Sequence, residues 1–195
     1  IKSDRRKKII VSTDIGVGYG KKRGIGFRAS AGANIRPITP LNINIEIVQD
    51  LRPTYMQWVD IIHGSVDTIR VYANSKQKTR DITLRLNWTF SPEFTLECFL
   101  QPFYASMNYI DYYRHVAPRT MELTEFNYLD NYENPGFSIN NTVGTIVLRW
   151  EYKLGSTFYL VYNINNSNYF SQETQEWSKN SDNAIFIKFN YWLKI

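Results

Sequence analysis

Residues 81–90 read Asp-Ile-Thr-Leu-Arg-Leu-Asn-Trp-Thr-Phe, and this stretch decides the fold class. Every even position carries an apolar side chain, and every odd position carries a polar one. Successive side chains of a β-strand point to opposite faces, whereas a helix would mix the two sets around its circumference. The stretch is therefore predicted to be a β-strand with one apolar face and one polar face.

The same alternation recurs along the chain and predicts eight strands. It is clear in Leu41–Ile47, in Thr145–Tyr152 and in Ile185–Ile195. Several of these stretches exceed the five or six residues of a typical strand. We therefore expect an all-β, antiparallel, up-and-down fold. Its strands are expected near residues 8–20, 23–36, 40–61, 67–90, 93–108, 142–153, 156–164 and 184–195.

The connections between these strands differ strongly in length. Residues 36–40, 91–92 and 154–155 form tight turns with Pro or Gly in turn positions. Residues 109–141 and 165–183 are long, polar and rich in Asn, Tyr and Glu. In an up-and-down order the tight turns lie at one end and these two predicted extracellular loops at the other. This asymmetry is typical of outer-membrane barrels.

Two environments explain strands with one apolar face. In a soluble sandwich that face packs on a second sheet, and in a transmembrane barrel it contacts lipid. Strands of about ten alternating residues match a tilted crossing of the hydrocarbon layer. Aromatic residues near the tight-turn ends predict a belt at one membrane interface. We therefore predict that residues 1–195 form a transmembrane β-barrel in a bacterial outer membrane, with the sandwich as the alternative. The predicted interface aromatics are Trp88, Phe90, Trp150, Tyr152 and Tyr191.

The polar positions of the strands predict the lining of a lumen. Acidic and basic residues are balanced among them, whereas a pore that selects ions of one sign would show a ring of one charge. We interpret this interior as structural, with transport of a glycan or small solute as the alternative. The predicted lumen-lining residues are Asp81, Arg85, Glu97, Arg149, Glu151 and Lys188.

Composition excludes several classes of protein. The chain has 195 residues, a net charge of +5, one cysteine and two histidines. A disulfide framework, a cysteine-based metal cluster and a multi-histidine metal site are excluded, and we expect no metal and no cofactor. Lys and Arg are scattered apart from Arg5–Lys8 and Lys21–Arg23, so we expect no nucleic-acid partner. Cys98 lies on the apolar side of its strand and is interpreted as a lipid-facing or buried thiol.

No catalytic motif is present. A Gly-x-Ser-x-Gly nucleophile elbow and a nucleotide-binding glycine motif are both missing. Gly16, Gly18 and Gly20 lie within a strand pattern and are interpreted as small residues where strands curve or another segment packs closely. The loop carboxylates Glu122, Glu125 and Asp130 leave a glycan hydrolase open as a lesser hypothesis. A solvated acidic loop is the favoured interpretation.

The tyrosines of the first long loop suggest a second kind of site. Aromatic rings stack on sugar faces, so these residues predict an extracellular glycan-binding surface. The alternative, which we favour, is that they order the loop by packing. The candidates are Tyr109, Tyr112, Tyr113, Tyr128 and Tyr132.

Three stretches carry a resemblance to a known family. Leu84–Phe94 (LRLNWTFSPEF), Gln101–Ser106 (QPFYAS) and Val147–Phe158 (VLRWEYKLGSTF) resemble the C-terminal region of a bacterial outer-membrane family of uncharacterised function. Its full-length members carry an N-terminal domain similar to family-nine carbohydrate-binding modules, followed by a large barrel. The resemblance covers the chain from the third predicted strand onward, and it offers no catalytic motif.

The resemblance implies a Gram-negative outer membrane and the last eight strands or so of a larger barrel. Residues 189–195 resemble the C-terminal signal read by the barrel-assembly machinery, although Ile195 replaces the aromatic residue that often ends it. The carbohydrate-binding module is absent here, so sugar binding is not transferred to any residue. We expect a scaffold or binding surface, linked through the family to carbohydrate binding. The expected partners are the lipid bilayer and an extracellular glycan or outer-membrane protein.

Overall fold

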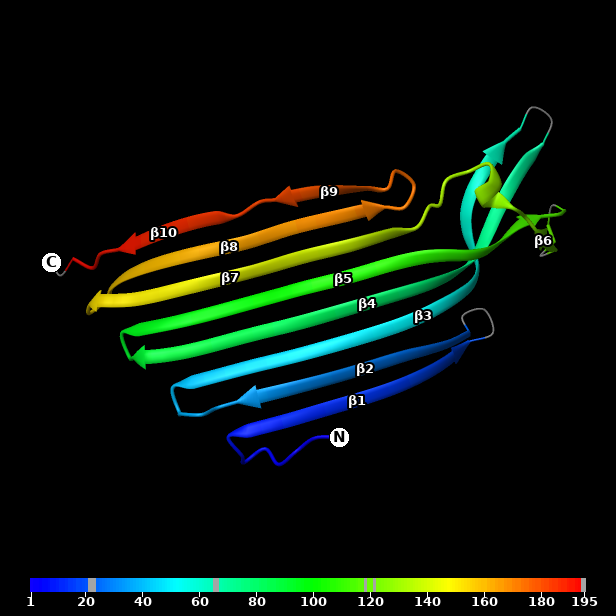
Figure 1. Cartoon of the computed structure of the whole chain (residues 1–195). Coiled ribbons are helices and arrows are strands. Elements are labelled where there is room, and N and C mark those ends of the chain that lie inside the picture. The colour runs from blue at the N-terminus through cyan, green and yellow to red at the C-terminus, as the bar shows by residue number, and fades with distance from the viewer. Residues whose placement is uncertain (21–23, 65–66, 118, 121, 194–195) are drawn as a thin grey trace.

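The protein is one antiparallel β-sheet in up-and-down order (Figure 1). The computed structural model describes residues 1–20, 24–64, 67–117, 119–120 and 122–193. Eight strands follow one another across the sheet: β1 (Ile9–Gly20), β2 (Gly24–Ile35), β3 (Leu41–His63), β4 (Thr68–Ser91), β5 (Phe94–His115), β7 (Phe137–Lys153), β8 (Ser156–Ser171) and β10 (Ala184–Asn190). Two short strands, β6 (Leu123–Glu125) and β9 (Glu176–Ser181), pair with β5 and β8. One 3-10 turn, η1 (Tyr128–Asp130), follows β6.

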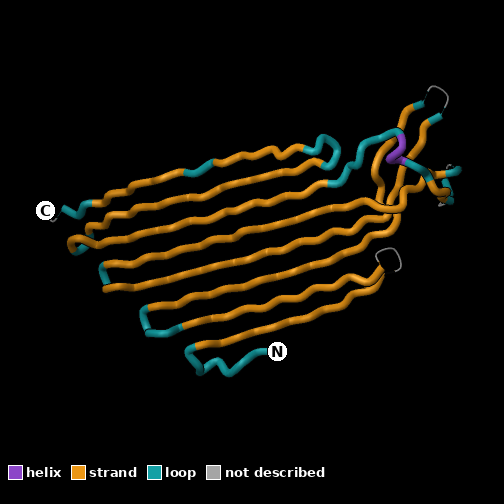
Figure 2. The backbone as a smooth tube through the Cα atoms, viewed as in Figure 1, coloured by secondary structure: helices purple, strands orange, loops and turns teal. Residues whose placement is uncertain are grey.

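The predicted fold class is confirmed at the level of an all-β antiparallel sheet. All eight predicted strands are present, and the connections at 36–40, 92–93 and 154–155 lie together at one end, here called the tight-turn end (Figure 2). β3 and β5 end, and β4 and β7 begin, toward the opposite side of the sheet, here called the distal end (Figure 2). The alternation of side chains predicted the strands, and the predicted up-and-down order agrees with the antiparallel pairing of consecutive long strands.

The two predicted long loops are corrected by the structure. Residues 109–115 continue β5, and residues 137–141 begin β7, so the connection within 109–141 is shorter than predicted. Within 165–183, β8 continues to Ser171 and β9 returns along it after a short turn. These extensions lack a continuous apolar face, so alternation did not reveal them. Backbone pairing holds them, with side-chain bonds such as Ser181 Oγ to Asn166 Oδ1 at 2.6 Å.

The predicted closure into a barrel is not seen. β1 and β10 form the two edges of an open sheet, with six long strands between them (Figure 1). Within the described ranges, β10 pairs on one side only, with β8. At the other edge, residues 1–3 run along β1, and the amino group of Ile1 donates to the carbonyl oxygen of Thr13 at 2.7 Å. The sheet is therefore a wall with two edges.

The buried core is small and lies at the distal end. It consists of Val71, Ala73, Tyr112 and Tyr128, with partly buried neighbours from β3, β4 and β5. The described residues contribute no second sheet to cover the long strands. Among them there is also no helix of the length and apolarity needed to cross a membrane. Most apolar side chains of the sheet are therefore not buried within this chain.

Candidate functional site: the two faces of the sheet

One hydrogen-bonded register line shows that the apolar positions of all eight long strands share a face. It starts at Ile9 on β1 and reaches Ile185 on β10 without a break. Because residues in register lie side by side, their side chains point to the same side of the sheet. The line passes through Ile9, Ile35, Ile43, Leu86, Cys98, Ile146, Tyr162 and Ile185.

This apolar face is exposed. The side chains of Ile15 and Ile187, near the two edges, are 71% and 68% exposed. Ile47, Trp150 and Leu160 on the strands between them are exposed as well. Monomeric soluble proteins rarely present contiguous apolar patches larger than a few hundred Å². The face therefore requires an apolar neighbour that this chain does not supply from its described residues.

The exposed apolar side chains form a band that runs obliquely across the strands. On β1 the band extends from Ile9 to Tyr19, entirely on the distal side of the register line. At the other edge it begins at Ile185 of β10, continues through Phe189 and reaches Leu193 just after the strand, on the tight-turn side of the same line. The band thus shifts by about one residue per strand relative to the hydrogen-bond direction. Such a shift means that the strands are tilted relative to the normal of the band, as strands are tilted relative to the axis of a sheared, curved sheet.

The predicted aromatic belt gathers at the tight-turn end of the band. Trp88 stacks on Phe90 at a ring-centroid distance of 4.1 Å, and Trp150 contacts Tyr152 at 6.0 Å. The ring of Tyr152 also stacks on that of Phe189 on β10, at 5.2 Å.

Tyr191 belongs to the same end of the sheet. It lies just after β10, where its hydroxyl accepts from Lys153 Nζ at 3.4 Å. The same ammonium group lies 5.1 Å from the centre of the Tyr191 ring. The grouping of the predicted interface aromatics at one end is as expected, and their place in a membrane interface stays a prediction.

The six predicted lumen-lining residues share the polar face. Arg149 pairs with Glu151 at 2.9 Å, and Asp81 accepts from Gln101 Nε2 at 2.6 Å. Glu97 is exposed. The two remaining cations lie over aromatic rings, Arg85 over that of Phe99 and Lys188 over that of Tyr159.

Ion pairs that join two strands are rare among the described residues. Of the three pairs present there, only the one between Arg28 and Asp50 links neighbouring strands. Amide and hydroxyl bonds connect strands instead, as between Asn34 Nδ2 and Asn42 Oδ1 at 2.9 Å. Among the described residues, neutral polar side chains therefore connect the strands of this face more often than ion pairs do.

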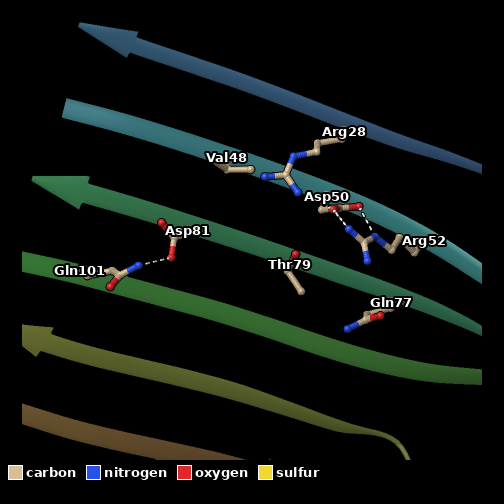
Figure 3. Close-up of a pocket in the computed structure, with 8 residues that line it drawn as sticks. All are labelled: Arg28, Val48, Asp50, Arg52, Gln77, Thr79, Asp81 and Gln101. Carbon is tan, nitrogen blue, oxygen red and sulfur yellow. Dashed lines mark hydrogen bonds and ion pairs between the residues drawn. The ribbon is translucent and has the colours of Figure 1, made fainter. Parts of the chain in front are cut away.

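A hollow of about 410 Å³ opens on this polar face (Figure 3). Strands β2 to β5 each contribute side chains to it. At its centre Asp50 accepts from Arg52 Nε and Nη2 at 2.9 and 2.6 Å, and Arg28 Nη1 lies 3.5 Å from the same carboxylate. Asp81 and Gln101 form the opposite wall. The residues lining the hollow are Arg28, Val48, Asp50, Arg52, Gln77, Thr79, Asp81 and Gln101.

Sequence reasoning did not single out this cluster. Arg28 belongs to the polar positions of its strand, but Asp50 and Arg52 follow the most apolar part of β3, where the alternation weakens. The sequence did contain a signal for part of the cluster: Asp50 and Arg52 carry opposite charges two residues apart on one strand, and side chains at this spacing point to the same face. The third member, Arg28, is brought alongside by the β2–β3 register, which places it opposite Asp50.

The distal end of the polar face is covered by a cap, defined as residues 122–136 with β6 and η1. The cap packs on Val71 and Ala73, which are buried and continue the row of polar-face positions along β4. Tyr128 of the cap stacks on Tyr112 of β5 at 4.9 Å, and its hydroxyl donates to a carboxylate oxygen of β3, Asp60 Oδ2, at 3.2 Å. The cap therefore packs on the same face of the sheet that carries the hollow.

The cap uses two of the five tyrosines that were predicted to bind glycans. Tyr112 and Tyr128 are only 8% and 6% exposed, and the second side of the Tyr128 ring is stacked by Tyr132 at 5.0 Å. Rings covered in this way offer no free face to a sugar. For Tyr112 and Tyr128, the structure therefore agrees with the interpretation that these tyrosines order the loop by packing. Tyr109 packs against the same core, whereas Tyr113 is partly exposed and Tyr132 is exposed.

Burial has a clear electrostatic effect in the cap. Loss of hydration raises the pKa of Tyr112 to about 12, because the charged phenolate is disfavoured away from water. The pKa of Tyr128 is raised to about 12 by burial first and then by the negative charge of Asp60. Both phenols are therefore held in their neutral forms.

The candidate catalytic carboxylates are not assembled into a site. Glu122, Glu125 and Asp130 are all exposed, and none of them lines the hollow on the polar face. Within the described ranges, no three His, Cys, Asp or Glu side chains are placed to hold a metal ion. The geometry thus offers binding surfaces, and hydrolysis by these carboxylates stays a hypothesis without structural support.

These features define a class: an all-β protein built on one antiparallel sheet with an exposed apolar face and a hollowed polar face. The chain belongs to the family DUF5916, described as a domain of unknown function, which it matches over residues 1–193. The match agrees with the predicted membership of an uncharacterised family and extends it toward the N-terminus. Comparisons with the curated proteins and with the solved structures gave no match.

Proposed function

We propose that this chain forms part of the wall of a transmembrane β-barrel in a bacterial outer membrane, where it serves as a scaffold. The apolar band would contact lipid, the polar face would face a water-filled lumen, and the cap would lie outside the hydrocarbon layer. The single observation that carries the proposal is the exposed band, continuous over eight strands and oblique to them.

The slope of the band supports a membrane wall over a soluble sheet. A shift of one residue, about 3.3 Å, for each strand spacing of about 4.8 Å corresponds to strands tilted by roughly 35° from the band normal. Strands of membrane barrels tilt by about 35–45°. A soluble layer that packs on another sheet has no need for such a consistent slope across every strand.

The height of the band supports the same conclusion. On β4 the apolar side chains run from Ile82 to Phe90. This length is about 27 Å along the strand and, after the tilt, about 22 Å along the band normal. Outward-facing apolar bands of membrane barrels are about 25 Å tall. The extensions of β3, β4 and β5 then project beyond the band at the distal end, as extracellular segments do.

The open edges place a requirement on the proposal. Lipid satisfies no backbone hydrogen bond, so β1 and β10 must each have a strand partner in the membrane. β1 runs toward the distal end and β10 runs away from it. The two edges could therefore close into a barrel through antiparallel pairing, either with each other or with further strands, while the apolar band stays at one height around the barrel. The resemblance to the C-terminal part of a larger barrel favours further strands as these partners.

Cys98 allows a direct test, because it is the single cysteine of the chain and lies on the apolar face opposite Leu86. The protein would be inserted in the outer membrane of a Gram-negative host and treated with a membrane-impermeant maleimide. We expect Cys98 to stay unlabelled in membranes and to react after unfolding in denaturant.

The matched control is Glu97→Cys in a Cys98→Ala background. Glu97 is the adjacent residue on the polar face and is exposed, so this thiol should react from the aqueous side. Protection of Cys98 together with labelling at position 97 supports the proposal. Equal labelling of the two thiols in intact membranes would overturn it, as would recovery of the folded protein in the aqueous fraction without detergent.

A further inference from the structure

We propose that the hollow on the polar face binds the anionic group of a small solute, a carboxylate or a phosphate, through the guanidinium groups of Arg28 and Arg52. The inference rests on the proposed function in one respect, because it needs the polar face to be open to water. It goes beyond a scaffold by assigning a ligand class to the side of the sheet that faces the lumen.

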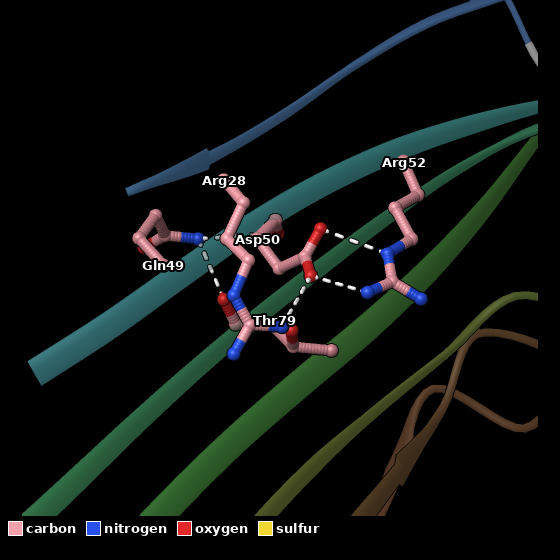
Figure 4. Close-up of polar contacts among 5 residues, drawn as sticks. All are labelled: Arg28, Gln49, Asp50, Arg52 and Thr79. Atoms are coloured by element: carbon pink, nitrogen blue, oxygen red, sulfur yellow. Dashed lines mark hydrogen bonds and ion pairs between the residues drawn. The ribbon is translucent and has the colours of Figure 1, made fainter. Parts of the chain in front are cut away.

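The first argument is the way in which one carboxylate holds two guanidinium groups. Both oxygens of Asp50 are bonded to Arg52, and Arg28 shares one of them (Figure 4). Asp50 is buried, whereas the Arg28 and Arg52 side chains are 56% and 61% exposed. These three residues together carry one uncompensated positive charge, and the buried carboxylate fixes the position of both cations.

The second argument concerns the donors that remain. A guanidinium has five N–H groups, and those of Arg match carboxylate and phosphate oxygens in a planar, bidentate geometry. Asp50 engages two nitrogens of Arg52 and one of Arg28. Within the described residues, no other protein acceptor is bonded to these two guanidinium groups. Their remaining donors are preorganised for an incoming anion.

The second carboxylate of the hollow does not compete for these donors. Asp81, on the opposite wall, accepts from Gln101 Nε2 at 2.6 Å and from Thr83 Oγ1 at 3.2 Å. Each of its two oxygens is thus bonded to a neutral group of its own wall. The anion is therefore expected on the side of Arg28 and Arg52, away from Asp81.

The third argument is the free space beside these donors. A second hollow of about 640 Å³ adjoins the first and shares Arg28, Asp50 and Arg52 with it. Its floor contains Gly16 and Gly18 of β1, where an added Cβ would meet no atom within 4 Å. Of the two roles predicted for these glycines, strand curvature or close packing, the close packing is not seen among the described residues. The bare backbone leaves room for a ligand next to Arg28.

A purely structural role explains the cluster less well. An ion pair between β2 and β3 needs only Arg28 and Asp50, yet this contact is the longer one at 3.5 Å. The shorter contact joins Arg52 to Asp50 within one strand and holds no two strands together. Because the Arg52 side chain is 61% exposed, water screens this pair and reduces its contribution to stability. Orientation of two cations toward one hollow is what the arrangement achieves.

The test is isothermal titration of the detergent-solubilised, folded protein with inorganic phosphate and, separately, with succinate. We expect saturable binding of at least one of them, and the comparison distinguishes phosphate from carboxylate recognition. Arg28→Gln and Arg52→Gln are each expected to weaken binding by about tenfold or more, as for loss of a charge-assisted hydrogen bond. Arg85→Gln, on the same face outside the hollow, and Arg80→Gln, on the opposite face, should leave it unchanged.

Gly18→Val provides a steric variant that alters no charge. It should reduce binding by filling the second hollow, while the unfolding midpoint stays that of the parent. Absence of saturable binding in the parent protein, or an equal loss in Arg85→Gln, would overturn the inference. Cys98 labelling separates this failure from that of the proposed function: a protected Cys98 without anion binding refutes only the ligand site, whereas a freely labelled Cys98 refutes the membrane wall.

Discussion

Replacement of Leu86 by arginine tests the membrane wall by energetics. Leu86 lies midway along the apolar band of β4, between Ile43 and Cys98 in the register. An arginine at the midplane of a membrane barrel costs about 2–4 kcal/mol. This cost corresponds to a change of roughly 30- to 700-fold in the unfolding equilibrium. We expect Leu86→Arg to lower the free energy of unfolding in lipid vesicles by this amount.

The adjacent position supplies the control, and a second position supplies a depth profile. Asn87→Arg faces the opposite side, in register with Glu97, and should change the free energy of unfolding by no more than about 0.5 kcal/mol. Ile82→Arg lies near the distal limit of the band and should cost about 0–1 kcal/mol, because the penalty falls toward the interface. A soluble sandwich would also penalise Leu86→Arg but has no dependence on membrane depth.

The assay is urea unfolding in vesicles, followed by tryptophan fluorescence. Equal free energies of unfolding for Leu86→Arg and Asn87→Arg would refute the reasoning, since the two positions differ mainly in the face to which they point. Equal losses for Leu86→Arg and Ile82→Arg would refute the lipid environment in particular.

Local geometry at two glycines and one tyrosine leads to further expectations. Gly144→Val should lower the free energy of unfolding by about 1–3 kcal/mol, because the added Cβ would lie 2.9 Å from both the Leu100 side chain and the Phe99 carbonyl oxygen. An unchanged urea midpoint would contradict this prediction. Gly155→Ala should lower the free energy of unfolding by about 1–2 kcal/mol in the same assay, because Gly155 has a φ of +76° in the β7–β8 turn and Trp192 packs over it. A variant as stable as the parent would mean that the turn adjusts to the added methyl group. The raised pKa of Tyr128 favours the protonated phenol in the folded cap, so the contribution of this phenol to cap stability is complete below about pH 10 and is lost as the pH rises through about 12. Hydrogen exchange should show the cap of the parent protein opening in this pH window. An identical profile in Tyr128→Phe would exclude this residue as the cause.

The sheet was predictable because its signal is local. Alternation assigns each side chain to a face without knowledge of any partner strand, and Pro or Gly marks the turns at 36–40, 92–93 and 154–155. The distal extensions were missed for the same reason. Residues 165–168 are polar on both faces, so their strand is specified by backbone pairing with β7 and β9, which a single strand's sequence does not reveal.

The cap was not predictable because a bulge changes the faces of β5. Ala73 lies opposite Tyr112, and the next residue, Asn74, lies opposite Ile110, so Asp111 is an extra residue in β5. Asp111 has a φ of 52°, an uncommon conformation for a residue other than glycine. The extra residue shifts Tyr112 onto the polar face, where it meets the cap. Strict alternation would have placed Tyr112 on the apolar face and left no tyrosine stack.

The pleat of the sheet allows the two proposals to be tested with separate variants. Adjacent residues such as Leu86 and Asn87 point to opposite sides, so a change that affects contact with lipid does not reach the hollow. Leu86→Arg should therefore weaken insertion without altering anion affinity in the folded fraction, and Arg52→Gln should do the reverse. If Leu86→Arg changed both insertion and anion affinity, the two faces of the wall would be coupled. If Arg52→Gln changed both, the charge on Arg52 would have a structural role.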